Sequence, residues 1–275
     1  MTLSEWIQQH PFLTKIAGLQ GRVDATAAAF LSAPIAPPAW DAYAADHASG
    51  VPLLHATHVA IDLAPAATLV RSLAADVASA PVPPGLARDA GELVADLAAP
   101  DAAPDAAARA IAWVVRGEGS APARHGGLLV FLGWAALRRT LEPVKDAYRA
   151  WSGAQAWRQP YCPTCGAPPV LAQLVPEGAG RARILCCGPC GTTWAWKRIA
   201  CPHCGNEAQD RLDVLEVDGE EGLRLDTCRS CNGYVKTITR EPVEPFLLAD
   251  WTTLHLDALA KERGLERRGS SLYDM

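Results

Sequence analysis

The chain has 275 residues, of which 49% are hydrophobic, and a formal net charge of −5 at pH 7. A chain of this length can fill one large core or two ordinary ones, and we expect two domains. The negative charge gives no general attraction to nucleic acid, and no part of the chain is strongly basic. Lys and Arg number 11 against 14 Asp and Glu in residues 1–157, 10 against 9 in 158–240, and 4 against 7 in 241–275.

The amino-terminal sequence and the cysteines together bear on the cellular compartment. The first six residues have neither a basic nor an apolar signal region, so we expect no secretory signal. The most hydrophobic run, residues 126–137, is about a dozen residues long, short of the roughly 20 that cross a bilayer. We therefore expect a cytoplasmic protein with no stable membrane insertion, in which the nine cysteines are reduced and favour metal ligation over disulfides.

The part before the first cysteine is predicted to be a helical domain, residues 1–157. Phe12, Ile16, Leu19 and Val23 follow helical spacing and are expected on one helical face. Further helices are predicted over residues 65–79, 86–97, 104–115 (with Asp101 or Asp105 near its start) and 127–151. The apolar stretch 128–137 is expected to be core rather than a docking site.

The later part changes to short segments rich in turns. Strands are predicted over residues 170–175, 183–185, 213–217 and 234–238, and a closing helix over 249–261, capped at Asp250. The fold class is therefore α+β, with a helical domain followed by two tandem four-cysteine modules and a carboxy-terminal helix. The expected modules are residues 158–198 and 199–240, and the helix and tail occupy 241–275.

A duplicated cysteine pattern is the strongest feature of the sequence. Cys162-Pro-Thr-Cys165-Gly recurs 39 residues later as Cys201-Pro-His-Cys204-Gly, and Cys187-Gly-Pro-Cys190 recurs 41 residues later as Cys228-Arg-Ser-Cys231. The two Cys-x-x-Cys knuckles of each copy are separated by 21 and 23 residues. One duplicated metal-binding module explains this repeat.

Cys-x-x-Cys turns place two sulfurs at a spacing that suits a tetrahedral ion, and two turns complete the coordination. The Gly residues after Cys165, Cys190 and Cys204, and Asn232 after Cys231, suit a turn with positive φ. Four thiolates around a divalent ion leave a charge of about −2, which calls for nearby donors. The available cations are Arg183, Lys197, Arg198, Arg224 and Arg229.

Two ways of pairing the knuckles are open. Sequential sites would join Cys162 and Cys165 with Cys187 and Cys190, and Cys201 and Cys204 with Cys228 and Cys231. A cross-brace would instead join the first knuckle with the third and the second with the fourth. The duplication favours sequential sites, because each copy then forms a complete module.

The remaining thiol and the histidines are assigned no metal. Cys186 is interpreted as a bystander, and His203 as an exposed residue within its knuckle. His55, His58 and His125 lack any metal-ligand spacing. Trp194 and Trp196 are expected to pack between the modules.

The sequence contains no phosphate-binding loop, dinucleotide fingerprint or recognisable catalytic set. A site closed by four thiolates also leaves no position for substrate, unlike a catalytic zinc site. We therefore predict a protein that is not an enzyme and has no catalytic residues.

The four knuckles, with Trp194, Arg198, the His10-Pro11 pair and the closing Asp-Trp-Thr-Thr-Leu-His-Leu-Asp segment, resemble the formate dehydrogenase accessory protein FdhE family. The resemblance implies a helical domain before two rubredoxin-like modules, with one iron ion in each. It also implies a cytoplasmic factor that binds the catalytic subunit of respiratory formate dehydrogenase during maturation. The tail, residues 267–275, departs from the pattern expected of the family.

Some alternatives remain open at the level of sequence. Zinc also accepts four thiolates, so ligand type does not choose between zinc and iron. A zinc-ribbon nucleic-acid-binding protein and a rubredoxin-like electron carrier are the competing functions, the first disfavoured by the balanced charge. Whether the protein forms a homodimer is left open.

Overall fold

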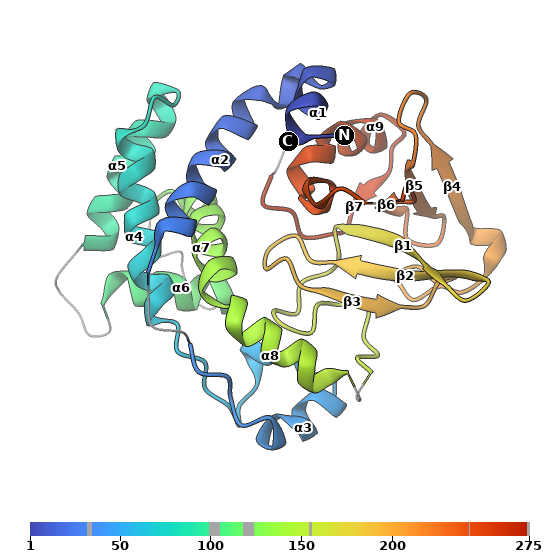
Figure 1. The fold of residues 1–275 in the computed structure, drawn as a ribbon, viewed down its shortest axis with the longest axis horizontal. Helices are drawn as coiled ribbons and strands as arrows, with labels where there is room; N and C mark the ends of the chain where they lie inside the picture. The colour runs from blue at the N-terminus through green and yellow to red at the C-terminus, as the bar shows by residue number, and fades with distance from the viewer. Residues whose placement is uncertain (32–34, 99–104, 118–123, 154–155, 242, 274–275) are drawn as a thin grey trace. The chain divides into compact units, whose positions relative to one another are not determined.

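The computed structural model describes residues 1–31, 35–98, 105–117, 124–153, 156–241 and 243–273 (Figure 1). Helices fill the first part of the chain, and a β-sheet with two four-cysteine clusters and a final helix follow. The predicted fold class is therefore confirmed. Among the described residues, no helix is both long enough and apolar enough to span a membrane.

The helices before the sheet differ from the prediction mainly at their ends and in number. Two short helices, α1 and α3, were not predicted, because their apolar residues do not span enough turns to show helical periodicity. The helices are α1 (Leu3–Gln9), α2 (Thr14–Ala29), α3 (Trp40–Ala48), α4 (Ala64–Ser79), α5 (Pro84–Ala98), α6 (Ala106–Arg116), α7 (Gly126–Thr140) and α8 (Glu142–Ser152).

Two expectations about these helices were wrong. The helix predicted over 127–151 is two helices, separated at Leu141, because Pro143 in the first turn of α8 cannot donate a backbone hydrogen bond to the preceding turn. Phe12 lies in a 3₁₀ turn (Pro11–Leu13) before α2 and is 59% exposed, so it does not share a buried face with Val23. For the helix predicted over 104–115, Asp105 is the N-cap, and Asp101 lies outside the described residues.

Contacts divide the chain into two compact units, which we describe separately. The helical unit comprises Thr14–Ala44 and Leu54–Gly153. Its central helix is α4, which packs against α2, α5, α6 and α7. Leu69 and Leu73 of α4 are fully buried, and the predicted core stretch in α7 contributes buried Leu129, Leu132 and Leu137.

The metal-cluster unit comprises Met1–Leu13, Ala45–Leu53 and Ala154–Met275. Two segments from early in the chain thus belong to it. Trp6 of α1 is 1% exposed and donates its indole N–H to the Thr252 carbonyl at 2.9 Å. Leu53 donates its backbone N–H to the Pro163 carbonyl at 2.8 Å. The four-part division predicted from sequence is a different partition and stays a prediction.

The sheet of the metal-cluster unit repeats the duplication seen in the sequence (Figure 1). Its strand order is β3-β2-β1-β6-β5-β4, so the three strands of each copy lie in the same order. The copies meet where β1 pairs with β6 in parallel, with Leu171 opposite Lys236. The strands are β1 (Leu171–Glu177), β2 (Gly180–Cys186), β3 (Thr193–Trp196), β4 (Leu212–Glu216), β5 (Leu223–Cys228), β6 (Gly233–Ile238) and β7 (Glu266–Arg267), which pairs with β6.

The carboxy-terminal helix, α9 (Leu254–Glu262), begins later than predicted and is not capped by Asp250. Asp250 lies in a preceding 3₁₀ turn (Asp250–Thr253), and its carboxylate accepts a hydrogen bond from the Lys236 ammonium at 2.5 Å. Asp257 of α9 accepts another from the same ammonium at 2.7 Å. A buried lysine therefore uses the carboxylate that the sequence pattern assigned to a helix cap, because a buried charge requires a partner.

Candidate metal centres

Each knuckle has a backbone conformation that follows from the residue after its second cysteine. Gly166, Gly191 and Gly205 have φ between 71° and 77°, and Asn232 has φ of 56°. The N–H of each of these three glycines bonds to the carbonyl of the first cysteine of its knuckle, at 2.9 to 3.1 Å. Glycine adopts this conformation without steric cost and asparagine tolerates it, so the predicted turn chemistry is confirmed.

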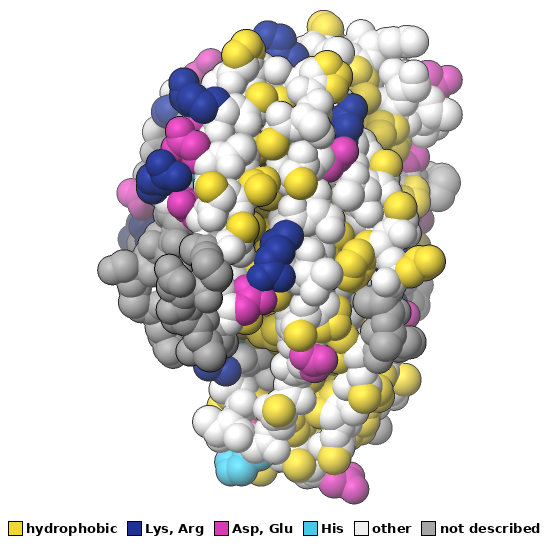
Figure 2. Space-filling model, turned by 90° about the vertical axis from the view of Figure 1, so that its left-hand side faces the viewer, with side chains coloured by type: hydrophobic (Ala, Val, Ile, Leu, Met, Phe, Trp, Pro, Cys, Tyr) yellow, Lys and Arg dark blue, Asp and Glu magenta, His cyan; other side chains and the backbone are white. Residues whose placement is uncertain are grey.

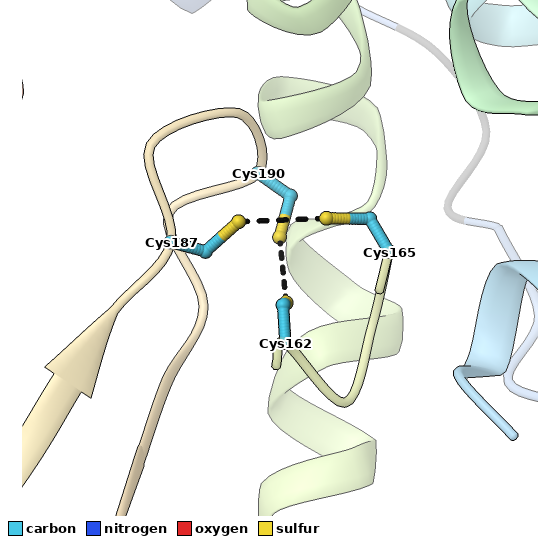
Figure 3. A group of neighbouring side chains, drawn as sticks. All are labelled: Cys162, Cys165, Cys187 and Cys190. Atoms are coloured by element: carbon cyan, nitrogen blue, oxygen red, sulfur yellow. Dashed lines mark hydrogen bonds between the residues drawn. The ribbon is translucent and has the colours of Figure 1, made fainter. Parts of the chain in front are cut away.

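The first cluster joins the two knuckles of the first copy. The sulfurs of Cys162, Cys165, Cys187 and Cys190 point toward a common centre (Figure 3), and all four residues are buried. The Cys162 and Cys190 sulfurs are 3.4 Å apart, as are those of Cys165 and Cys187. Thr164 donates its backbone N–H to the Cys162 sulfur, the kind of donor that a thiolate requires.

The second cluster has the same construction but is more open to solvent. It joins Cys201, Cys204, Cys228 and Cys231, of which Cys204 is exposed and Cys231 half-buried. The sulfurs of Cys201 and Cys231 are 3.7 Å apart, as are those of Cys204 and Cys228. The structure thus groups the cysteines sequentially, and the cross-brace alternative was wrong.

Both clusters fit a tetrahedral metal ion. A metal–sulfur bond of about 2.3 Å implies sulfurs roughly 3.8 Å apart around a tetrahedral ion. The measured separations of 3.4 and 3.7 Å are close to this value. The donor sets suit zinc or iron, which would hold the loops together.

Burial and hydrogen bonding shift the pKa values of thiols in the first cluster. Hydrogen bonding with Cys162 raises the pKa of Cys165 well above its ordinary value, and burial does the same for Cys187. Burial opposes ionisation of Cys190 as well, but hydrogen bonds from the other three thiols outweigh it and hold its pKa well below the ordinary value. Protein groups alone therefore disfavour the thiolate forms of Cys165 and Cys187, whereas a divalent cation would stabilise them.

Arg183 and Arg224, two of the cations expected to compensate the thiolate charge, bind a carboxylate. Arg183 of β2 donates to the Asp226 carboxylate of β5 at 2.8 Å and to the Ala200 carbonyl at 2.8 Å. Arg224 forms a second ion pair with Asp226 at 2.9 Å. These two arginines, each four residues before the second knuckle of its copy, thus meet at one half-buried acid, which ties the first copy to the second.

Cys186, His203 and Trp194, also singled out in the sequence, are not among the residues that form the two cysteine clusters. Cys186 is 3% exposed, packs with Val170 and Leu171, and burial raises the pKa of its thiol to about 12. His203 is half-buried rather than exposed, because its Nε2 lies 3.0 Å from the Tyr234 carbonyl, and burial lowers its pKa. Trp194 is 6% exposed, as expected of a packing residue.

A third group was missed by the sequence analysis. His10, Glu220 and His255 bring one ligand atom each to within 4.8 Å of the others. His10 and His255 both lie in segments that carried the family resemblance, but 210 residues separate His10 from Glu220. No short-range spacing could have linked them.

Comparison with known proteins supports the family resemblance. Residues 199–273 match the model described as FdhE, C-terminal domain. The chain is 36% identical over 118 residues to a protein named FdhE homolog from Stutzerimonas stutzeri, covering 42% of this chain and 38% of that protein. It is 33% identical over 113 residues to one from Aquifex aeolicus, covering 40% of each. These matches therefore span well under half of each relative.

A solved structure extends the similarity to the whole fold. The crystal structure of the FdhE protein from Pseudomonas aeruginosa matches with a TM-score of 0.64 and 25% sequence identity, covering 95% of this chain and 88% of that one. At this coverage the match includes helical as well as sheet elements. The resemblance to the FdhE family is therefore confirmed, with residues 199–273 carrying the FdhE C-terminal domain inside an FdhE-like fold.

Proposed function

We propose that this protein is a non-enzymatic accessory factor for the maturation of respiratory formate dehydrogenase and that it binds the catalytic subunit of that enzyme in the cytoplasm. The observation that carries the proposal is the pair of four-cysteine clusters within an FdhE-like fold. Four sulfur ligands complete a tetrahedral ion and leave no position for substrate, which supports a binding role rather than a catalytic one.

We further propose that all eight cysteines are metal ligands and that each cluster holds one iron ion. Iron adds a function that zinc does not offer, because an iron–thiolate site can change oxidation state. The second cluster is better placed for such a role, since Cys204 is exposed while all four cysteines of the first cluster are buried. In this proposal the first cluster is structural and the second reports the redox conditions under which an oxygen-sensitive client is bound.

The main competing function is nucleic-acid binding by zinc ribbons. Binding to phosphates requires clustered Lys and Arg, and the chain carries a net charge of −5. On the face shown in Figure 2, most basic side chains lie next to acidic ones. Two basic side chains close to the knuckles in sequence are also paired, with Lys197 bound to Glu207 and Arg229 bound to Asp213.

The experiment is an anaerobic co-purification of the tagged full chain from cells that make formate dehydrogenase. We expect the catalytic subunit to be recovered with the wild type and lost with Cys201→Ser/Cys204→Ser. Cys186→Ala is the matched control, because it removes a buried thiol outside both clusters. Iron content and the thiolate-to-iron charge-transfer absorption of the same samples report the metal.

Each outcome separates the candidates. Recovery of the subunit with the double variant at wild-type level would contradict a role for the second cluster in binding. Recovery of nucleic acid with steep salt dependence would favour a zinc ribbon, and rapid electron exchange with a purified redox partner would favour an electron carrier.

A further inference from the structure

The group formed by His10, Glu220 and His255 lies apart from both cysteine clusters and has no part in the function proposed above. His10 follows α1, Glu220 lies in the turn between β4 and β5, and His255 is in the first turn of α9. All three belong to the metal-cluster unit. Their side chains are 10%, 13% and 18% exposed, so the group is close to the surface without being fully solvated.

The hydrogen bond of His10 fixes which of its nitrogens faces Glu220. Its Nδ1 lies 3.0 Å from the Trp6 carbonyl, and a carbonyl can only accept, so Nδ1 carries a proton. The lone pair of neutral His10 is then on Nε2, which lies 2.7 Å from the Glu220 carboxylate, also an acceptor. Two acceptors this close require either a proton between them or a metal ion that both atoms bind.

His255 supplies the second observation. Its Nε2 lies 3.2 Å from the same Glu220 oxygen, an ion-pair contact without hydrogen-bond geometry, and its Nδ1 has no hydrogen-bond partner, although both atoms are buried. Buried polar atoms without partners are uncommon and costly. An ion bound by Nε2 of His255 would satisfy one of them.

The ring geometry favours a shared ligand. The His10 and His255 rings have centroids 4.8 Å apart and an interplanar angle of 31°, and the Trp6 ring packs against both, 4.0 Å from His10 and 6.0 Å from His255. Two imidazole nitrogens and one carboxylate oxygen form the donor set of open zinc sites, and a carbonyl acceptor behind a histidine ligand is the usual way such a ligand is oriented.

We propose that His10, Glu220 and His255 bind a third divalent transition-metal ion, through Nε2 of each histidine and a carboxylate oxygen. Donors around a tetrahedral zinc ion are roughly 3.3 Å apart, so the 3.2 Å separation already fits and the 2.7 Å separation would lengthen by about half an ångström. Unlike the cysteine clusters, this site has three protein ligands and keeps a fourth position for water or another ligand. Phe12 lies at its edge, with its ring 5.8 Å from that of His10.

The test uses the full chain with both cysteine clusters already loaded with zinc. Added Zn²⁺ is titrated by calorimetry at neutral pH, and added Co²⁺ by absorption. We expect one further equivalent of zinc to bind the wild type, and the cobalt form to show ligand-field bands without the thiolate charge-transfer band of a cysteine site. His255→Ala and the nearly isosteric Glu220→Gln lose this equivalent, whereas His58→Ala, an exposed histidine elsewhere, retains it.

The retained metal of the cysteine clusters in each variant shows that the unit is folded. A wild type that takes up no further equivalent overturns the proposal, and the group is then a proton-bridged ion pair between His10 and Glu220. An extra equivalent that persists in both variants also overturns it, because the ion then binds elsewhere. Neither result bears on formate dehydrogenase binding.

Discussion

Lys236 shows how a single buried charge holds several elements together. It lies in β6, is 1% exposed, and forms ion pairs with Asp250 and Asp257, whose side chains are 2% exposed. Replacing it by methionine keeps the volume but removes the cation that Asp250 and Asp257 share, and Asp257 keeps an ion pair with Arg267 at 3.4 Å. Breaking a buried ion pair from one side costs about 3–5 kcal/mol.

We therefore expect Lys236→Met to lower the free energy of unfolding by about 3–5 kcal/mol, measured by denaturant titration. Lys261→Met, an exposed lysine of α9, is the control and is expected to change it by less than about 0.5 kcal/mol. A cost for Lys236→Met no larger than that of the control would show that the carboxylates are satisfied by other donors.

His47 gives the metal-cluster unit a pH dependence of known sign. It is 5% exposed, packs against the Trp157 ring at 5.2 Å, and burial lowers its pKa below the ordinary 6.5. The unfolded chain then binds a proton that the folded chain does not, so stability is lost as pH falls below about 6.5, by up to ~1.4 kcal/mol per pH unit.

Measuring unfolding at several pH values between neutral and mildly acidic would check this. His47→Phe keeps an aromatic ring there and is expected to flatten this part of the profile, whereas His58→Phe is not. Acid also competes with metal for thiolates, but this contribution is common to all three proteins and cancels in their comparison. Parallel profiles for the wild type and His47→Phe would disprove the assignment.

Residue types at special backbone positions were predictable, but long-range partners were not. The turn after each knuckle follows from one local requirement for positive φ, which Gly166 and Asn232 meet. Strand 234–238 was also predicted, yet nothing local shows that Lys236 in it is buried. Its partners lie 14 and 21 residues away, in a segment that reads as a helix start.

At the scale of elements, strong periodicity predicted the long helices, whereas two short strands were missed. Residues 65–79 match α4 because apolar residues recur over several turns. Strands β3 and β5 were not predicted. Strand β3 has only four residues, and β5 was missed although its alternation of apolar positions with Arg224 and Asp226 is the pattern of a half-buried strand. Those two charges meet in an ion pair, which the sequence alone could not show.

The two clusters should differ in reactivity although they share a sequence pattern. All four cysteines of the first cluster are buried, whereas Cys204 is exposed and Cys231 is half-buried. With a chelator present, we expect an alkylating reagent to label Cys204 and Cys231 before Cys162 and Cys190. Mass spectrometry of peptides over time measures the order.

Cys186 is the internal control for this labelling experiment. It ligates no metal in either cluster but is 3% exposed, so it should react only when the unit unfolds. Labelling of Cys186 at the rate of Cys204 would mean that chelation unfolds the whole unit. Earlier labelling of the first cluster would contradict the predicted order.

The packing of α7 against α6 depends on Gly133. A Cβ at this position would lie 3.0 Å from a methyl of Val114. Gly133→Leu is therefore expected to destabilise the helical unit by about 1–3 kcal/mol through overpacking. Gly91→Leu in α5, where a Cβ meets nothing within 4 Å, should instead stabilise it by about 0.5–1 kcal/mol through helix propensity. Thermal unfolding of both variants checks the pair, and equal signs would contradict the argument.

At the scale of the whole molecule, each of the two units is built from segments that are not consecutive in the sequence. Residues 1–13 belong to the metal-cluster unit, although more than 140 residues separate them from its first cysteine. Helical spacing placed Phe12 with the helix that follows, because periodicity carries no information about contacts across the chain. The same limit hid the grouping of His10 with Glu220 and His255.

The amino-terminal segment should therefore stabilise the metal-cluster unit rather than the helices that follow it in sequence. Trp6 is 1% exposed, its ring packs on His10 and Phe246, and its indole N–H bonds to Thr252. Trp6→Ala removes a large buried side chain and orphans a carbonyl, at an expected cost of about 3–5 kcal/mol. Hydrogen exchange can assign this cost to a unit, since it reads local stability along the chain.

We expect Trp6→Ala to speed exchange in β5, β6 and α9 and to hasten release of metal from the cysteine clusters, while α4 and α7 keep wild-type protection. Trp40→Ala is the matched control, because Trp40 stacks on Trp151 in the helical unit at 5.3 Å and should show the reverse pattern. Loss of protection in α4 with Trp6→Ala, at an unchanged rate of metal release, would place the amino-terminal segment with the helices instead.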